Sequence, residues 1–162
     1  MYLYHGSYAD FDIPNPFKGK YYRDFGVGFY LAENENDALG ISVKHGDGKL
    51  YTYELDVDAL FSSCNVLEFY DYNEEDFLKF IFHNRKYGGV DNQEYDVIIG
   101  PTAGGNINAL FDEIRKRDLS YQKSRNNIYR EASNTSMGIQ WCMTGNLPVG
   151  FLELVEVEDV YR

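Results

Sequence analysis

Alternating apolar and polar positions predict the clearest strand of the chain at residues 50–57. From Tyr51 to Val57 the odd-numbered positions are apolar, and the even-numbered positions between them carry Thr, Glu and Asp. Because successive side chains of a strand point to opposite faces, this period of two indicates a strand buried on one face. Apolar and aromatic runs predict further strands at 2–5, 29–32, 95–99, 139–144 and 151–157.

Helices are predicted where a capping side chain precedes a run of apolar positions and glycine follows it. Asn34 or Asn36 can cap a helix that stops before 46–48. Asn73 and Asp76 resemble a capping box, which opens a helix that ends near Gly88-Gly89. Further helices are predicted at 106–117 and 120–132. Strands at both ends, with helices between them in no regular alternation, indicate an α+β fold.

Composition favours a single folded domain over residues 1–162. The chain has 162 residues, of which 44% are hydrophobic and 17% aromatic, too apolar for a disordered chain. The two cysteines, Cys64 and Cys142, are too few for a disulfide scaffold, and no spacing of Cys or His suggests zinc or another metal. The reducing cytosol is therefore the expected compartment, and a cytoplasmic protein is predicted.

The charge balance bears on the partners of the chain. Its 26 acidic and 15 basic residues give a net charge of −11, which disfavours nonspecific binding of nucleic acid. A local basic patch could still form from the cluster Arg115, Lys116, Arg117, Lys123, Arg125 and Arg130, which is interpreted as a solvated helix face. No apolar run approaches the ~20 residues that a membrane span needs, and the first residues read as a strand rather than a signal peptide.

Two short motifs carry most of the functional information. Tyr4-His5-Gly6-Ser7 and the segment 24–31, Asp-Phe-Gly-Val-Gly-Phe-Tyr-Leu, each read as a strand that meets a glycine turn. One polar ring stands at each junction, His5 in the first and Tyr30 in the second. Two such strands side by side would form a cleft with a tyrosine face as its wall, which fits a nicotinamide ribose.

These motifs resemble the ADP-ribosyltransferase superfamily, in its diphtheria-toxin and poly(ADP-ribose) polymerase branch. There the first strand carries His-Gly-(Ser/Thr) and the second carries Gly-x-Tyr, as at His5-Gly6-Ser7 and Gly28-Phe29-Tyr30 here. The closer resemblance is to a family of short bacterial domains that are often encoded beside a small partner, in what look like toxin–antitoxin pairs. The segments 96–101 and 139–144 are similar to its central strand and to its late Gln-aromatic strand.

The resemblance implies a fold, a substrate and a set of site residues. It implies two apposed β-sheets that form an NAD cleft, with helices packed outside. His5 would bond the ribose hydroxyl of NAD, the backbone of Gly6 would bond the nicotinamide carboxamide, and the ring of Tyr30 would stack on nicotinamide. Ser7 and Gly28 complete the two motifs that would bind NAD, although Ser7 could equally make only a local turn bond.

The third catalytic position of the superfamily is assigned to Gln140. Period-two alternation puts Gln140, Cys142 and Thr144 on one face of the strand and leaves the opposite face to pack the core. Glutamine can orient a ribose hydroxyl but cannot act as a base, so we expect slow turnover or an acceptor that brings its own nucleophile. Arg23 could clamp the NAD diphosphate, with Lys18 and Lys20 as weaker candidates.

The predicted activity is cleavage of the nicotinamide–ribose bond, with transfer of ADP-ribose to an unidentified acceptor. A protein or small-molecule acceptor is favoured over nucleic acid, and a small antitoxin-like protein is a candidate partner. Two alternatives stay open. The chain could be a noncatalytic module that binds NAD or ADP-ribose, or a protein-interaction domain on the same fold.

Overall fold

The strands form one seven-stranded mixed sheet in the order β4-β5-β6-β2-β1-β3-β7. The computed structural model describes residues 1–88 and 94–162 of the chain. The strands are β1 (Tyr2–Ser7), β2 (Phe29–Ala32), β3 (Gly48–Leu55), β4 (Val66–Glu68), β5 (Val97–Pro101), β6 (Ile139–Met143) and β7 (Leu152–Val160). The helices are α1 (Glu35–Ser42), α2 (Val57–Ser63), α3 (Glu75–Tyr87), α4 (Ile107–Arg117), α5 (Tyr121–Ser133) and α6 (Asn146–Val149), with a 3-10 turn at Pro16–Lys18.

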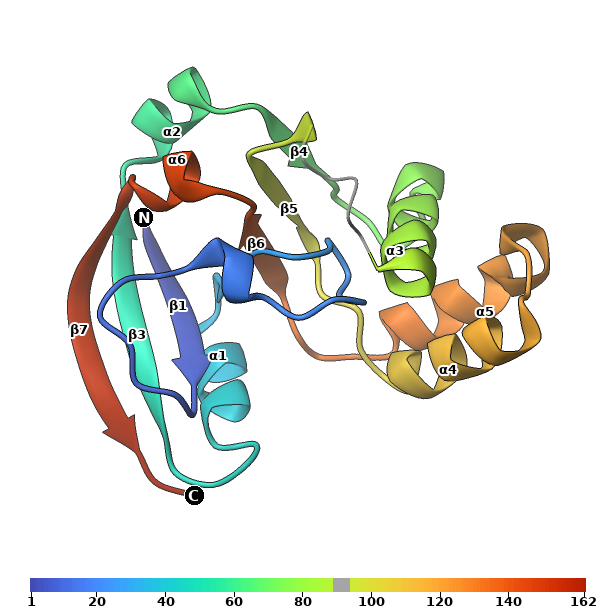
Figure 1. Cartoon of the computed structure of the whole chain (residues 1–162), viewed down its shortest axis with the longest axis horizontal. Coiled ribbons are helices and arrows are strands. Elements are labelled where there is room, and N and C mark those ends of the chain that lie inside the picture. Colours follow the sequence, from blue (N-terminus) through green and yellow to red (C-terminus); the bar gives the residue numbers. More distant parts are fainter. Residues whose placement is uncertain (89–93) are drawn as a thin grey trace.

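The centre of the sheet is held by few backbone contacts. β1 and β2 share a single register pair, Tyr4 with Ala32, whereas β1 pairs with β3 along its whole length. In Figure 1, β1, β3 and β7 stand on one side of the molecule, apart from β4, β5 and β6. The α+β class is confirmed. The predicted pair of apposed sheets is replaced by one continuous sheet, because β2 pairs with β1 on one edge and with β6 on the other.

Side-chain caps fix where α1 and α5 begin, whereas the capping box predicted from Asn73 and Asp76 does not form and α3 begins without a side-chain cap. The Oδ1 of Asn34 accepts a hydrogen bond from the backbone N–H of Asn36 at 2.9 Å, and α1 follows. Ser120 caps α5 in the same way. α3 ends at Tyr87, followed by Gly88 in the left-handed region with φ 96°. Gly89, the second glycine of the predicted stop, lies outside the described residues.

The strand predicted at 50–57 is displaced by a helix that the periodicity does not reveal. β3 occupies Gly48–Leu55, and α2 begins at Val57. The reason is local: the Oδ1 of Asp56 accepts from the backbone N–H of Ala59 at 3.1 Å and caps α2. A helix start therefore overrides the alternation at its last two positions. The short elements β4 and α6, of three and four residues, also had no periodic signal.

Each face of β6 packs into a separate hydrophobic core. Cys142 packs with residues of α3, α4 and α5, the helices gathered at one end of the molecule in Figure 1. Trp141 and Met143 belong to the core on the opposite face. The predicted alternation along this strand is confirmed. The expectation that only the opposite face packs the core is wrong, because Cys142 is itself buried in a core. The alternation puts Gln140 on the same face as Cys142, toward α3–α5.

Candidate functional site

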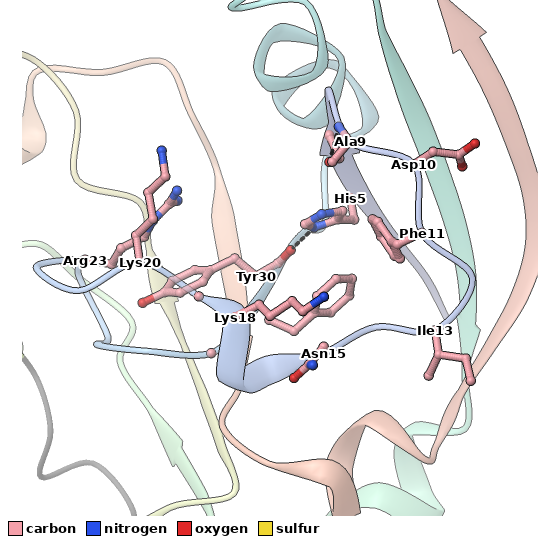
Figure 2. Close-up of a pocket in the computed structure, with 14 residues that line it drawn as sticks. His5, Ala9, Asp10, Phe11, Ile13, Asn15, Lys18, Lys20, Arg23 and Tyr30 are labelled. Atoms are coloured by element: carbon pink, nitrogen blue, oxygen red, sulfur yellow. Dashed lines mark hydrogen bonds between the residues drawn. The ribbon is translucent and has the colours of Figure 1, made fainter.

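His5, Arg23 and Tyr30, from the two opening motifs, line two adjoining cavities. The first, here called the loop cavity, has a volume of about 320 Å³ and lies under the loop that joins β1 to β2 (Figure 2). The second, here called the Gln140 cavity, has a volume of about 300 Å³ and reaches Gln140 on β6. Because three side chains are common to both, the two cavities are neighbouring parts of one site.

The predicted site residues divide between these cavities. Gly6 and Gln140 line the Gln140 cavity, whereas Ser7 and Gly28 line the loop cavity. The hydroxyl of Ser7 accepts a hydrogen bond from the backbone N–H of Ala9 at 3.0 Å, so it is engaged in the local turn. The residues that the resemblance associates with the nicotinamide riboside, His5, Gly6, Tyr30 and Gln140, all line the Gln140 cavity.

His5 is held against the neighbouring strand as a neutral ring. Its Nδ1 lies 2.6 Å from the carbonyl oxygen of Tyr30 (Figure 2), and its ring stacks on Phe29 with centroids 4.3 Å apart. Burial lowers the pKa of His5 from 6.5 to about 4; the hydrogen bond to Tyr30 opposes this, and the charge of Arg23 adds to it. Since a carbonyl oxygen only accepts, Nδ1 carries the proton and Nε2 is left as an acceptor.

Tyr30 presents its ring rather than its hydroxyl to the site. The hydroxyl donates to the carbonyl oxygen of Gly26 at 2.6 Å and accepts from the backbone N–H of Phe25 at 3.0 Å, so it closes the glycine turn. Burial raises the pKa of Tyr30 well above its usual value. The guanidinium of Arg23 lies 5.6 Å from the ring centroid. The ring is thus fixed at its far end and lines both cavities.

The glycines of the two motifs are required by packing. A Cβ on Gly6 would lie 2.0 Å from the carbonyl oxygen of Ala38, so the backbone of α1 occupies that space. A Cβ on Gly28 would lie 2.4 Å from the Sγ of Cys142 on β6. The close contact between β1 and α1 therefore requires glycine at position 6.

Gly6→Ala is expected to lower the free energy of unfolding by about 1–3 kcal/mol, because the added methyl group must displace α1. Gly40 provides a matched control within α1, since a Cβ there would meet nothing within 4 Å. Gly40→Ala should stabilise by about 0.5–1 kcal/mol through its higher helix propensity. Urea unfolding followed by circular dichroism measures both changes. Equal stability of Gly6→Ala and the wild type would contradict the packing role of Gly6.

Gln140 is bound to a buried carboxylate that the sequence analysis does not assign to the site. Its Nε2 donates to the Oδ2 of Asp24 at 2.8 Å, and Asp24 is 3% exposed. The Oδ1 of Asp24 accepts from the Nε of Arg85 on α3 at 2.7 Å, and Oδ2 also accepts from the backbone N–H of Ala103 at 3.0 Å. Asp24, Arg85 and Gln140 therefore form a charged network that joins the glycine turn, α3 and β6.

This network fixes the orientation of the Gln140 amide. Because a carboxylate only accepts, the NH₂ group must face Asp24 and the carbonyl oxygen must point away from it. Among the described residues, the Oε1 of Gln140 accepts no hydrogen bond. It is also not a fully buried atom, because the one fully buried side-chain N or O atom without a partner in these residues is the Oγ of Ser124. The carbonyl oxygen of Gln140 is therefore exposed to the Gln140 cavity and can accept from a ligand.

A third cavity, here called the basic pocket, continues from the Gln140 cavity. It has a volume of about 360 Å³ and shares Arg23, Lys44 and Arg85 with the Gln140 cavity. Lys20 and Arg115 add two more cations, and Asp112 is its one acidic residue among those described. The pocket therefore concentrates positive charge on a protein whose net charge is −11.

Arg115 lines the basic pocket and contacts both an acidic and an aromatic side chain. Its Nη2 donates to Asp112 at 2.7 Å, and its guanidinium lies 4.8 Å from the ring centroid of Tyr22. Tyr22 has a φ of 64°, which is uncommon for a residue with a side chain. Lys116, Arg117, Lys123 and Arg130 are exposed, as a solvated helix face requires. Arg115 and Arg125 are half-buried and form ion pairs with Asp112 and Glu75.

Residues 1–146 match a protein family described as "Protein of unknown function (DUF3990)". The chain belongs to the DUF3990 family. A search of curated proteins found no match. The DUF3990 region contains every described residue that lines the three cavities, whereas β7 lies beyond it.

Several residues of the DUF3990 site could not be assigned from the sequence. Asp24 stands in the second motif, but its partners Arg85 and Gln140 lie 61 and 116 residues away along the chain. Lys44 follows α1, and Arg85 lies in the last turn of α3, where a basic residue is favoured by the helix dipole alone. The one signal in the sequence that could have indicated this network was Asp24 itself, an acidic residue directly before the turn at Phe25-Gly26.

Two further features of the DUF3990 chain bear on its chemistry and its environment. Within residues 1–88 and 94–162, no three His, Cys, Asp or Glu side chains gather in a group that could hold a metal ion. In the same residues no helix has both the length and the apolar character needed to span a membrane.

Proposed function

We propose that this chain is an NAD-dependent ADP-ribosyltransferase, which breaks the bond between nicotinamide and ribose and passes ADP-ribose to an acceptor. One observation carries the proposal: His5 from β1, Tyr30 from β2 and Gln140 from β6 line one cavity of about 300 Å³. These are the residues to which the resemblance assigns ribose binding, nicotinamide stacking and orientation of the reacting ribose. The volume is at the lower end of the range for ligand pockets, about 300–1,000 Å³.

His5 and Tyr30 are suited to the nicotinamide riboside end of NAD. The free Nε2 of the neutral His5 ring can accept a hydrogen bond from a ribose hydroxyl, because Nδ1 is already committed to Tyr30. The ring face of Tyr30 can stack on the cationic nicotinamide, to which the π-electrons are attracted. Nicotinamide becomes neutral when it leaves, so this attraction also falls and favours release of the product.

Gln140 would act at the reaction centre through its carbonyl oxygen. As the C–N bond breaks, positive charge develops on the ribose, and an oriented acceptor that binds the 2′-hydroxyl stabilises that charge. Asp24 and Arg85 hold the amide with Oε1 toward the cavity, so little reorganisation is needed. An uncharged carbonyl stabilises the ribose less than a carboxylate would, and slow turnover is expected.

The basic pocket adjoins this cavity in a position suited to the diphosphate. Arg23 and Lys44 line both, and neither forms an ion pair with another described residue. Arg23 is the predicted diphosphate ligand. Lys20 shares the pocket with it, whereas Lys18 lines the loop cavity. Guanidinium and ammonium groups are the usual ligands of diphosphates.

The proposal is tested by the release of nicotinamide from NAD by purified protein. Tyr30→Ala removes the stacking face, so we expect release to fall by at least about tenfold. Tyr161→Ala is the matched control, because Tyr161 is 76% exposed and lies beyond the DUF3990 region. We also propose that the chain is the toxin of a toxin–antitoxin pair. Expression in a bacterial host tests this role: the wild type should arrest growth and Tyr30→Ala should not.

The other outcomes separate the alternatives. NAD binding that depends on Tyr30, without release under any condition, would indicate a noncatalytic module. A folded protein with no measurable NAD affinity by titration calorimetry would indicate an interaction domain. Release that is equal in the wild type and Tyr30→Ala would refute the assigned site.

A further inference from the structure

The Gln140 cavity offers an acceptor no effective general base among the described residues. Its lining contains two side chains of a type that could take a proton near pH 7, His5 and Asp24. Burial lowers the pKa of His5 to about 4, so its Nε2 is a weak base. Both carboxylate oxygens of Asp24 are occupied by Arg85, Gln140 and the N–H of Ala103.

The remaining ionisable side chains of this cavity are phenols and cations. They are Tyr4, Tyr30, Arg23, Lys44 and Arg85. Neither type readily accepts a proton near pH 7. A neutral acceptor such as water, an alcohol or an amine must lose a proton when it attacks the ribose. The described cavity has no group suited to take that proton.

The same cavity opens toward positive charge. Arg23, Lys44 and Arg85 belong to both the Gln140 cavity and the basic pocket. The described lining of these two cavities has five cations and two carboxylates, of which Arg85 is paired with Asp24 and Arg115 with Asp112. Lys20, Arg23 and Lys44 form no ion pair with other described residues, and all three are exposed. Such a concentration of charge raises the local concentration of anions. These three cations, unpaired among the described residues, outnumber the two negative charges of a dinucleotide diphosphate by one.

We infer that the acceptor of ADP-ribose is an anionic oxygen, of a phosphate or a carboxylate group, held by the cations between the Gln140 cavity and the basic pocket. This inference rests on the proposed transferase activity. The C–N bond to nicotinamide breaks and its electron pair leaves with nicotinamide, which becomes neutral. A lone pair of the acceptor oxygen forms the new C–O bond at the same carbon. The anion needs to lose no proton, so the reaction balances without a base.

A competition between small acceptors tests the inference. Wild-type protein is incubated with NAD and equal concentrations of inorganic phosphate, acetate and methanol, with sodium chloride added to match ionic strength across controls. Mass spectrometry then measures ADP-ribosyl phosphate, ADP-ribosyl acetate, methyl ADP-riboside and free ADP-ribose. We expect the phosphate and acetate products together to exceed the methyl product by at least about tenfold, the size of effect that placed charges give in binding and catalysis.

Lysine variants connect the preference to the pocket. Lys44→Gln should lower the ratio of anionic to methyl product several-fold, since it removes one shared cation. Lys116→Gln is the matched control, because Lys116 is exposed on α4 and lines none of the three cavities; its ratio should equal that of the wild type. A ratio that does not change in Lys44→Gln would overturn the assigned location.

The two anionic arms distinguish the source of the oxygen. Mainly phosphate product supports phosphate esters as natural acceptors, and mainly acetate product supports carboxylate side chains. Methyl ADP-riboside or free ADP-ribose as the main product would overturn the inference while leaving the transferase proposal intact. Absence of nicotinamide release with every acceptor would instead refute the transferase proposal on which the inference rests.

Discussion

Asp24→Asn is expected to lower the free energy of unfolding by about 3–5 kcal/mol, the range for removal of one partner from a buried ion pair. The side chains of Asp24 and Arg85 are 4% and 11% exposed, and the Arg85 Nε lies 2.7 Å from Oδ1. Asparagine keeps the volume of aspartate, so the loss would report charge and hydrogen bonding rather than a cavity. Nicotinamide release should be lost as well, because the Gln140 amide would no longer be fixed.

The reason for so large an effect is the number of donors that converge on one carboxylate. Arg85, Gln140 and the N–H of Ala103 all donate to Asp24. Asparagine offers one acceptor and one donor in place of two acceptors. At least one of these donors would then face another donor in a buried site, and the guanidinium would lose its counter-charge.

An exposed ion pair provides the matched control. Lys49 and Asp159 also lie 2.7 Å apart, but their side chains are 29% and 60% exposed. Asp159→Asn should therefore lower the free energy of unfolding far less than Asp24→Asn does. Guanidinium unfolding of the wild type and both variants measures the difference. Similar losses in the two variants would contradict the structural role of the buried network.

Gln140→Glu is expected to abolish nicotinamide release at neutral pH. The new carboxylate would lie where the Gln140 Nε2 now stands, 2.8 Å from the Oδ2 of Asp24. Two carboxylates at that separation repel each other unless they share a proton. We therefore expect at least about a hundredfold loss of activity, since displacement of a catalytic group by an ångström costs about that much.

The sign of the pH dependence follows from the same repulsion. Like charge raises the pKa of the glutamate introduced by Gln140→Glu above about 4.3, the usual value of a glutamate, in the folded variant. The folded state then binds more protons than the unfolded state above that pH. The variant should therefore be closest to wild-type stability below about pH 4.3 and lose stability as the pH rises through the raised pKa.

A double variant separates charge repulsion from loss of shape. Asp24→Asn combined with Gln140→Glu exchanges the amide and the carboxylate, which returns one negative charge to the network beside Arg85. It should be more stable than the sum of the single losses predicts, by about 0.5–3 kcal/mol of coupling. Additive losses, or activity in Gln140→Glu that equals the wild type, would show that Asp24 and Gln140 are not coupled.

Local patterns in the sequence were sufficient for most elements of the fold. The alternation at 139–144 placed Gln140 and Cys142 on one face of β6, and the side chain of Asn34 marked the start of α1. These are interactions within a few residues, so the chain order contains them. Asp56 carried the same kind of signal for α2, but the alternation at 50–57 concealed it.

The sequence by itself determined the α+β class and brought His5, Tyr30 and Gln140 forward as candidates. Only the tertiary structure decided that the strands form one sheet, that Gly6 is required by α1, and that Asp24, Arg85 and Gln140 form one network. The basic pocket likewise combines residues from the loop after β1, from the end of α1, and from α3 and α4. The physical reason is range: caps and alternation act over a few residues, whereas buried ion pairs and close backbone contacts join segments that only folding brings together.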